Sequence, residues 1–336
     1  MKKLKRIFAV FFCLLLASGI LGGCGKAASS SAPALSASQS GSKPLKIVTT
    51  IFPEYDWVRE ILGDKADHAE VTMLLDNGVD LHSYQPTADD IIKISDCDLF
   101  IYVGGESDGW VEDALKEAAN KDMQVINLLD VLGKQVKEEE VVEGMEAEEE
   151  ESEDEDEPEY DEHVWLSLKN AETLCNAITD ALEEIDPANK DAYAANAASY
   201  LEKLAALDGE YQTVVDNAAR KTVLFGDRFP FRYLVDDYGL RYYAAFVGCS
   251  AETEASFETI SFLAGKVDEL GLPCVLTIEG AQHKIAETIV QNSAAKNQSV
   301  LTLDSMQSTT SADAANGTTY LSVMESNLDV LKQALN

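Results

Sequence analysis

The stretch PANKDAYAANAASYLEKLAALDGEYQTVVDN, from Pro187 to Asn217, decides the fold. It is rich in Ala, Leu, Glu and Lys, which favour a helix, and Gly209 is its only weak point. Pro187 suits the first turn of a helix. About thirty helical residues would span about 45 Å at about 1.5 Å per residue, enough to cross two domains. We therefore predict a stiff connector helix over residues 187–217.

Short apolar runs alternate with helical patterns on both sides of this connector, as in α/β proteins with parallel sheets. At 336 residues the chain is long enough for two such lobes, which we expect over residues 45–186 and 218–336. Ligands of parallel sheets bind beside the carboxyl ends of the strands, so the residues after each strand matter most. The strand-like runs are KIVTTIF, EVTMLL, LFIYVG, MQVINL, TVLF, YYAAF, CVLTI and SVLTL, and the clearest helical ones are YDWVREIL, WVEDALKEAAN, ISFLAGKVDEL and TTYLSVMESNLDVLKQAL.

The N-terminus has the pattern of a secretory signal. Basic residues precede an apolar run from Ile7 to Leu16, which is too short for a membrane-spanning helix. The word LGGC, ending at Cys24, resembles a bacterial lipobox, in which the cysteine is lipidated. We predict a signal peptide over residues 1–23, lipidation of Cys24, and a flexible tether up to residue 44. The protein is then expected on the extracytoplasmic face of the cell membrane.

The net charge of −34 argues against a nucleic-acid partner. Seventeen acidic residues lie between Glu138 and Glu162, so about half of this charge is local. A solvated spacer that prevents aggregation is one interpretation. A loop that attracts divalent cations weakly and unselectively is the other, and both stay open. We expect a disordered acidic loop over residues 137–160.

Two of the four histidines lie in loops just before helices. His82 follows the strand-like run EVTMLL, and His163 ends the acidic segment. Such a pair suits zinc and other borderline cations. His283 follows Glu279 at a strand end and could reach the same cleft, whereas His68 has the setting of an exposed turn.

Cysteine usage adds little to this picture. The cysteines beyond the signal form no CxxC pair, so a structural zinc knuckle is unsupported. Cys97 and Cys274 fit small core residues. A disulfide between Cys249 and Cys274 stays open, since spacing does not decide it.

Several of these words resemble the solute-binding lipoproteins of metal-ion ABC importers, of the zinc and manganese type. The segment GVDLHSYQPTADD resembles the first metal motif, with Leu81 in place of the usual Pro and Gln85 in place of the usual Glu. DEHVWLSLKNA resembles the second, usually Asp-Pro-His, with Glu162 in the proline position. The resemblance covers nearly all of the mature chain and extends to IVTTIFPEYDWVREILGD, YLVDDYGL, TIEGAQHKIAETI, LTLDS and TYLSVMESNLDVLKQAL.

The resemblance implies two α/β lobes joined by a long helix, a metal ion at their interface, and docking to an ABC permease. It implies metal ligands at His82 and His163 and a carboxylate ligand at Asp304. The third ligand of the family, His or Glu, falls at Arg228, whose guanidinium has no lone pair for a metal. We expect the neighbouring Asp227 to replace it.

Alternatives at this third position remain. Water or His283 could take the place of Asp227, which would then only cap a helix. Arg228 is expected to face away or to pair with an acid such as Glu279, acting behind the ligands.

The sequence thus predicts a monomeric, lipid-anchored receptor that captures zinc and delivers it to a permease, and not an enzyme. Manganese or ferrous iron would suit the same ligands. A surface adhesin and a secreted zinc hydrolase are weaker alternatives. The hydrolase would need an open coordination position and a general base, and the word HExxH is absent.

Overall fold

The computed structural model describes residues 43–146, 159–250, 254–280 and 282–336. The segment Lys43–Asn336 forms one unit with a continuous set of contacts. The predicted signal peptide, Cys24 and nearly all of the tether lie outside the described residues, as do residues 147–158 of the acidic segment.

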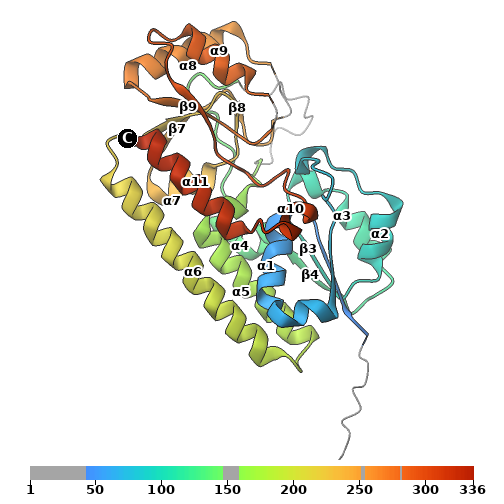
Figure 1. Ribbon diagram of the computed structural model, residues 1–336. Coiled ribbons are helices and arrows are strands. Elements are labelled where there is room, and N and C mark those ends of the chain that lie inside the picture. Colours follow the sequence, from blue (N-terminus) through green and yellow to red (C-terminus); the bar gives the residue numbers. More distant parts are fainter. Residues whose placement is uncertain (1–42, 147–158, 251–253, 281) are drawn as a thin grey trace, which may run out of the picture. The chain divides into compact units, whose positions relative to one another are not determined.

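Four parallel strands form the sheet of the N-terminal half: β1 (Leu45–Thr49), β2 (Ala69–Met73), β3 (Leu99–Tyr102) and β4 (Gln124–Asn127) (Figure 1). Their order is β2-β1-β3-β4, so β1 is paired on both sides. Ile47 of β1 stands opposite Val71 and Leu99. Ile47 and Leu99 are fully buried, as expected for strands of a parallel sheet.

Helices follow these strands and fix the loops at their carboxyl ends. The residue before the second helix, Thr87, forms a capping box with Asp90, which ends the loop containing His82. The helices of this half are α1 (Phe52–Leu62), α2 (Ala88–Ser95), α3 (Val111–Lys116), α4 (Leu128–Leu132) and α5 (Leu168–Ile185), with short 3₁₀ helices at Gly63–His68, Leu81–Ser83, Glu106–Asp108, Gly133–Gln135 and Val164–Leu166.

The C-terminal half is built from shorter parallel pairs. β5 (Thr222–Leu224) pairs with β7 (Arg241–Tyr243), β6 (Arg228–Phe229) with β8 (Phe246–Val247), and β9 (Cys274–Thr277) with β10 (Ser299–Thr302). A parallel bridge between Phe225 and Leu276 joins the first pair to the third. The helices here are α7 (Arg232–Tyr238), α8 (Phe257–Leu270), α9 (Lys284–Asn292), α10 (Ser311–Ala315) and α11 (Tyr320–Leu335).

The long helix α6 (Lys190–Asn217) joins the halves, as the composition predicted. It packs against α1 and α5 of the N-terminal half and against α7 and α11 of the C-terminal half. One face is buried at helical spacing, and on it the Tyr211 hydroxyl donates to the Met324 carbonyl at 2.6 Å. The buried residues of this face are Tyr193, Ala197, Tyr200, Leu204, Leu207, Tyr211 and Val215.

The start of α6 differs from the expected one. Pro187 lies in a turn between α5 and α6, and the helix begins at Lys190. The Asp186 carboxylate fixes this turn because it accepts hydrogen bonds from the Asn189 amide and the Tyr193 hydroxyl, both at 2.7 Å.

The acidic segment is folded at both of its described ends, which corrects the expectation of a disordered loop over residues 137–160. Glu138 pairs with Tyr160, and the Glu139 N–H donates to the Glu159 carbonyl at 2.9 Å. Glu146 forms a bridge to Phe246 of β8, and Met145 beside it is buried. Backbone pairing and apolar burial hold these ends despite their charge.

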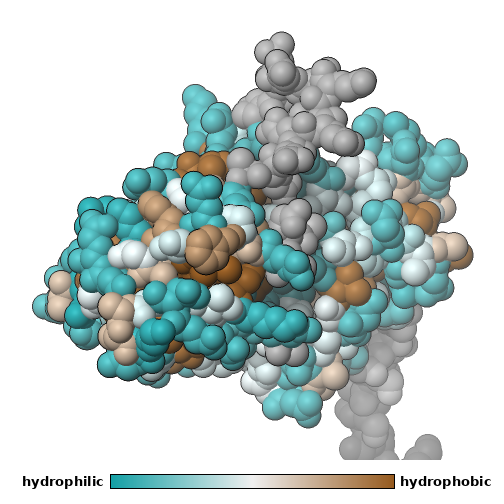
Figure 2. Space-filling model, turned by 90° about the horizontal axis from the view of Figure 1, so that it is seen from above, coloured by the Kyte–Doolittle hydropathy of each residue, from teal (hydrophilic) through white to brown (hydrophobic). Residues whose placement is uncertain are grey.

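Figure 2 shows a mainly hydrophilic face in which hydrophobic patches are small and separate. Among the described residues, none of the helices has the length and apolar character needed to cross a membrane.

Candidate metal centre

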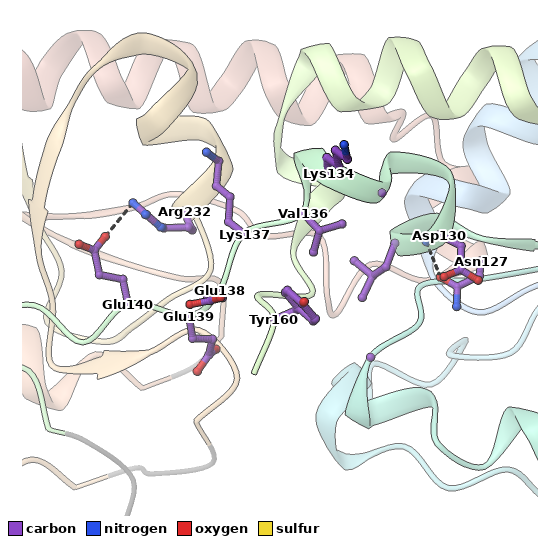
Figure 3. A pocket seen from close by; sticks show the side chains of 13 residues that line it. Asn127, Asp130, Lys134, Val136, Lys137, Glu138, Glu139, Glu140, Tyr160 and Arg232 are labelled. Atoms are coloured by element: carbon purple, nitrogen blue, oxygen red, sulfur yellow. Dashed lines mark hydrogen bonds and ion pairs between the residues drawn. The ribbon is translucent and has the colours of Figure 1, made fainter. Parts of the chain in front are cut away.

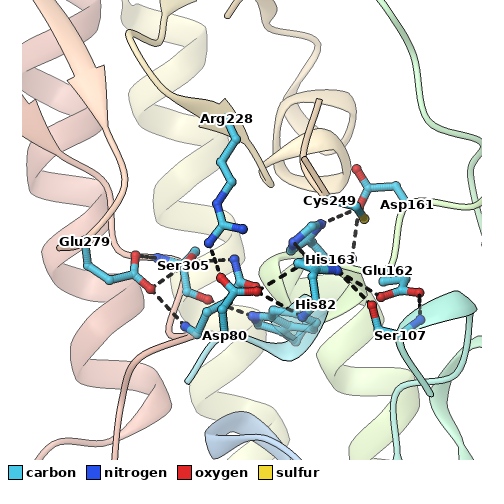
Figure 4. Close-up of polar contacts among 12 residues, drawn as sticks. Asp80, His82, Ser107, Asp161, Glu162, His163, Arg228, Cys249, Glu279 and Ser305 are labelled. Carbon is cyan, nitrogen blue, oxygen red and sulfur yellow. Dashed lines mark hydrogen bonds and ion pairs between the residues drawn. The ribbon is translucent and has the colours of Figure 1, made fainter. Parts of the chain in front are cut away.

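His82 and His163 face each other directly (Figure 4). Their Nε2 atoms are 3.1 Å apart. His163 is fully buried, and the His82 side chain is 10% exposed. Two imidazoles on a tetrahedral zinc ion, with Zn–N bonds of about 2.0–2.1 Å, hold their nitrogens about 3.3 Å apart. The structure therefore brings the two predicted histidines together at nearly the separation that a metal ion requires.

The same local hydrogen bond orients both histidines. His82 lies in the 3₁₀ helix after β2, and the Asp80 Oδ1 accepts its backbone N–H at 3.0 Å. His163 precedes the 3₁₀ helix Val164–Leu166, and the Asp161 Oδ1 accepts its N–H at 2.9 Å. An aspartate that binds the backbone two residues later forms a tight turn. The words Asp-Leu-His and Asp-Glu-His therefore indicate this turn at the level of the sequence.

The contacts of the two Nδ1 atoms determine which ring nitrogen of each histidine carries the proton. The His163 Nδ1 is 3.0 Å from the Asp161 carboxylate, which only accepts hydrogen bonds, so Nδ1 of His163 carries the proton. The Nε2 of His163 then accepts, and the Nε2 of His82 donates across the 3.1 Å gap. The His82 Nδ1 is left as the acceptor, 2.8 Å from the Ser107 hydroxyl. Before His82 can bind a metal through Nε2, its proton must move to Nδ1.

Glu162 lies where that proton would arrive. Its Oε2 is 3.4 Å from the His82 Nδ1 and accepts no hydrogen bond from the described residues, whereas its Oε1 accepts the Ser107 N–H at 2.9 Å. Burial of the Glu162 side chain raises its pKa. Gly105, with φ of +79°, leaves room for it, since a Cβ there would collide with the carboxylate. Sequence reasoning noted only that Glu162 replaces a proline.

The electrostatics of the site keep His82 neutral. Burial lowers the pKa of His82 to about 3, and the nearby His163 and Arg228 act in the same direction, while Asp80 opposes them. The imidazole therefore needs no deprotonation before it binds a metal ion at neutral pH.

Arg228 pairs with an acid, which fits one of the two expectations for this residue, but the acid is Asp80 and not Glu279. Burial opposes ionisation of Asp80, but Arg228 outweighs it and holds the pKa of Asp80 below its ordinary value. The expected partner Glu279 is already engaged, because it accepts hydrogen bonds from the Ser305 N–H at 2.6 Å and hydroxyl at 2.7 Å and from the Gln307 N–H at 2.9 Å.

The structure does not bring Asp227, Asp304 or His283 into the cluster around the paired histidines. The Asp227 carboxylate turns to the backbone instead, and accepts the N–H groups of Arg228 at 3.0 Å and Ile278 at 3.3 Å. These amides lie at strand ends and need acceptors, which explains why the Asp227 carboxylate turns to the backbone.

Asp304 and His283 lie at other loops of the C-terminal half. Asp304 follows β10, and its Oδ1 accepts the Met306 N–H at 2.7 Å. Burial and the nearby Glu279 raise the pKa of Asp304 to about 6. His283 precedes α9 and is partly buried.

Cys249 is the third member of the metal-ligating cluster that the described residues contain. One ligand atom each from His82, His163 and Cys249 lies within 4.8 Å of the others. The described cysteines are all free, so Cys249 and Cys274 are not bridged. Sequence reasoning considered Cys249 only as a disulfide partner, although it follows the strand-like run YYAAF by three residues.

Trp165 packs beside the paired histidines. Its ring centroid is 5.3 Å from that of His163, and its Nε1–H donates to the Ser305 carbonyl at 2.9 Å. Tyr320 of α11 donates to the Trp165 carbonyl at 2.7 Å. The tryptophan thus fixes His163 against the loop that follows β10.

Two cavities flank the centre. One, of about 630 Å³, is lined by Asp80, Arg228, Asp227 and Glu279 among others, and reaches the side of the Asp80–Arg228 pair. The other, of about 1040 Å³, is lined in part by residues 137–140 and Tyr160, at the two described ends of the acidic segment (Figure 3). Its charges are mixed and partly paired, as in the Arg232–Glu140 ion pair at 2.8 Å.

The chain thus combines a two-lobe α/β fold with a pair of buried histidines that face each other. The sequence profile of the family described as zinc-uptake complex component A, periplasmic (ZnuA), matches residues 47–334. The chain belongs to this family, which confirms the resemblance and the fold class expected from the sequence.

Characterised relatives have zinc in their names. The zinc-binding lipoprotein AdcA of Streptococcus pneumoniae is 33% identical over 290 residues, which cover 86% of this chain and 55% of AdcA. The high-affinity zinc uptake system protein ZnuA of Bacillus subtilis is 32% identical over 337 residues, covering 99% of this chain and 98% of that protein. The crystal structure of the Zn(II)-bound ZnuA-like domain of S. pneumoniae AdcA matches with a TM-score of 0.67 and 30% identity, over 87% of this chain and 98% of the domain. This chain therefore spans about half the length of AdcA.

Proposed function

We propose that the protein captures zinc outside the cytoplasm and delivers it to an ABC-type permease. The observation that carries this proposal is the 3.1 Å approach of the His82 and His163 Nε2 atoms in a buried setting. Family membership and the zinc-binding relatives support it.

Zinc is favoured over manganese and ferrous iron by the donors that lie close together. Manganese prefers oxygen ligands, whereas imidazole suits zinc. The expected carboxylate Asp227 is held by backbone N–H groups. Asp304 stays a candidate for a fourth ligand, and its Oδ1 already accepts the Met306 N–H.

We further propose that Cys24, in the word LGGC, is lipidated and anchors the protein to the membrane. At least two acyl chains are needed for stable anchoring. Incorporation of a labelled fatty acid in wild type and its loss in Cys24→Ala would establish the anchor.

The zinc proposal predicts that His82→Ala and His163→Ala each lose at least about a hundredfold in zinc affinity, about 2.7 kcal/mol. Competition titration against a chromophoric chelator would measure the loss. His68→Ala is the matched control, because His68 is exposed and is not part of the cluster around the paired histidines. Unchanged affinity in both site variants would end the zinc proposal.

A further inference from the structure

We infer that Cys249 supplies a thiolate ligand to the metal ion, in the role that the family gives to the position of Arg228. This inference rests on the zinc-binding function proposed above. The cluster of ligand atoms within 4.8 Å joins two imidazoles of the N-terminal half to one sulfur of the C-terminal half. The cation would then link the two halves of the chain.

The geometry requires only a small contraction around the ion. A tetrahedral zinc ion with Zn–S of about 2.3 Å and Zn–N of about 2.0–2.1 Å holds sulfur and nitrogen about 3.6 Å apart. The loop of Cys249 must therefore move by about 1 Å or less toward the histidines, starting from separations within 4.8 Å. Cys249 is partly exposed and lies in a loop just after β8.

Gly248 allows this loop to lie against the histidine. A Cβ at Gly248 would lie 3.0 Å from Cε1 and Nδ1 of His163 and 3.0 Å from the Phe229 carbonyl oxygen. Any larger residue would push the loop, and with it Cys249, away from His163. From the other side, the Cys249 N–H donates to the Glu139 Oε1 at 3.1 Å. The folded first end of the acidic segment, which contains Glu139, thus holds the cysteine in place.

Arg228 explains why a substitute ligand is needed. Its guanidinium pairs with Asp80, the residue that orients His82, and offers no lone pair to a metal. A thiolate from Cys249 restores a third protein ligand without displacing this ion pair.

Coordination by Cys249 requires the loss of its thiol proton. When the ion binds, the S–H bond of Cys249 breaks heterolytically, its electron pair forms the S–metal bond, and the proton passes to solvent. A donor set of two imidazoles and one thiolate is soft, so it favours zinc, cobalt(II) and cadmium over manganese. Cys249 would therefore determine which cations the protein accepts.

Cobalt(II) substitution tests this assignment. The Co(II)-loaded wild type should show an intense near-ultraviolet thiolate-to-metal band together with visible d–d bands. Cys249→Ser should lose the near-ultraviolet band, keep one bound ion, and bind zinc about 10–100-fold more weakly, while its manganese affinity changes little. Cys274→Ala is the control, since Cys274 is buried in β9, and it should retain the band.

The outcomes separate this inference from the proposed function. A Co(II)-loaded wild type without the thiolate band, or a Cys249→Ser variant with wild-type zinc affinity, would overturn the ligand role and leave zinc binding by the histidines intact. Absence of any tight Co(II) or zinc binding in wild type would instead refute the function itself. Circular dichroism of the serine variant checks its fold, and if it is unfolded, zinc protection of the wild-type Cys249 from alkylation decides the question.

Discussion

Glu162 shows how one residue prepares the centre for a cation. It is 2% exposed and brings a carboxylate next to His82, where the motif of the family has proline. In the metal-free state its Oε2 has no hydrogen-bond partner among the described residues, and such an atom in a buried place is costly. Metal binding at the His82 Nε2 moves the ring proton to Nδ1, which can then donate to this oxygen. The ion thereby satisfies a group that the empty site leaves unpaired.

Glu162→Ala is predicted to lower zinc affinity by about 10–100-fold, the usual effect of losing a partner that orients a metal-binding histidine. The Co(II) spectrum of the variant should keep the same ligand-type bands, because no ligand is removed. Glu162→Gln should lose less, since its amide oxygen can still accept from Nδ1. Glu112→Ala is the control, as the Glu112 side chain is 80% exposed on α3.

Equal zinc affinity in wild type and Glu162→Ala would show that the Oε2 atom has no part in binding. Loss of the thiolate band in that variant would show instead that Glu162 acts on the whole geometry of the site.

The residue-scale prediction from sequence succeeded where ligand type and loop position agreed. His82 and His163 combine a metal-binding side chain with a place at a helix entrance. Cys249 was missed because its role depends on an approach between distant segments, such as the contact of Gly248 with the His163 ring. No pattern along the chain encodes such an approach.

At the scale of helices and strands, segments with strong periodicity were predicted correctly, whereas very short strands and the charged segment were not. All eight strand-like runs overlap a strand of the structure. The strands β6 and β8 were missed, since two residues show no periodicity. The ends of the acidic segment were missed because charge suggested disorder, whereas backbone pairing with Glu159 and Tyr160 decided their conformation.

Gly209→Ala in the middle of α6 should stabilise the protein by about 1 kcal/mol, because alanine has the higher helix propensity. A Cβ at this position meets nothing within 4 Å, so no clash offsets the gain. Thermal unfolding should show a rise in Tm of about 2–4 °C. Zinc affinity should stay unchanged, as the substitution is not part of the site.

Gly63→Ala is the opposite case. Gly63 has φ of +55°, and a Cβ there would collide with the Asn196 side chain of α6, so its Tm should fall. A lower Tm for Gly209→Ala would mean that α6 is not a regular, stabilising helix at its centre.

At the scale of the whole molecule, several acids are buried in the folded chain. Burial raises the pKa of Glu54 to about 8, and the pKa values of Asp56 and Asp108 to about 7. Each is bound to backbone N–H groups, as when Asp56 accepts the Tyr320 N–H at 2.8 Å and joins α1 to α11. These carboxyls hold protons in the folded state that they release on unfolding at neutral pH.

The metal-free protein should therefore become more stable as the pH falls from 8 to 6.5. In this window the folded state binds more protons than the unfolded state, so the unfolding free energy decreases as pH rises, by up to about 1.4 kcal/mol per pH unit for each such carboxyl. His82 opposes this trend toward the acidic end of the window, because the unfolded imidazole is half charged at about pH 6.5.

Differential scanning calorimetry with a chelator present measures the trend. Glu54→Gln removes one of the titrating groups and should flatten the slope. A Tm that falls on acidification across this window would contradict the assignment of protonated buried carboxyls.

The contact between Trp165 and His163 gives the protein an optical property of its own. The indole is fully buried, with its ring centroid 5.3 Å from that of the imidazole. A closed-shell ion bound at His163 has no low-lying electronic states to accept excitation, so indole emission survives and only its colour responds to the new charge. An open-shell ion such as Co(II) or Cu(II) would extinguish the emission at this range. Fluorescence therefore distinguishes an occupied site from an empty one, and one kind of cargo from another, without any added dye.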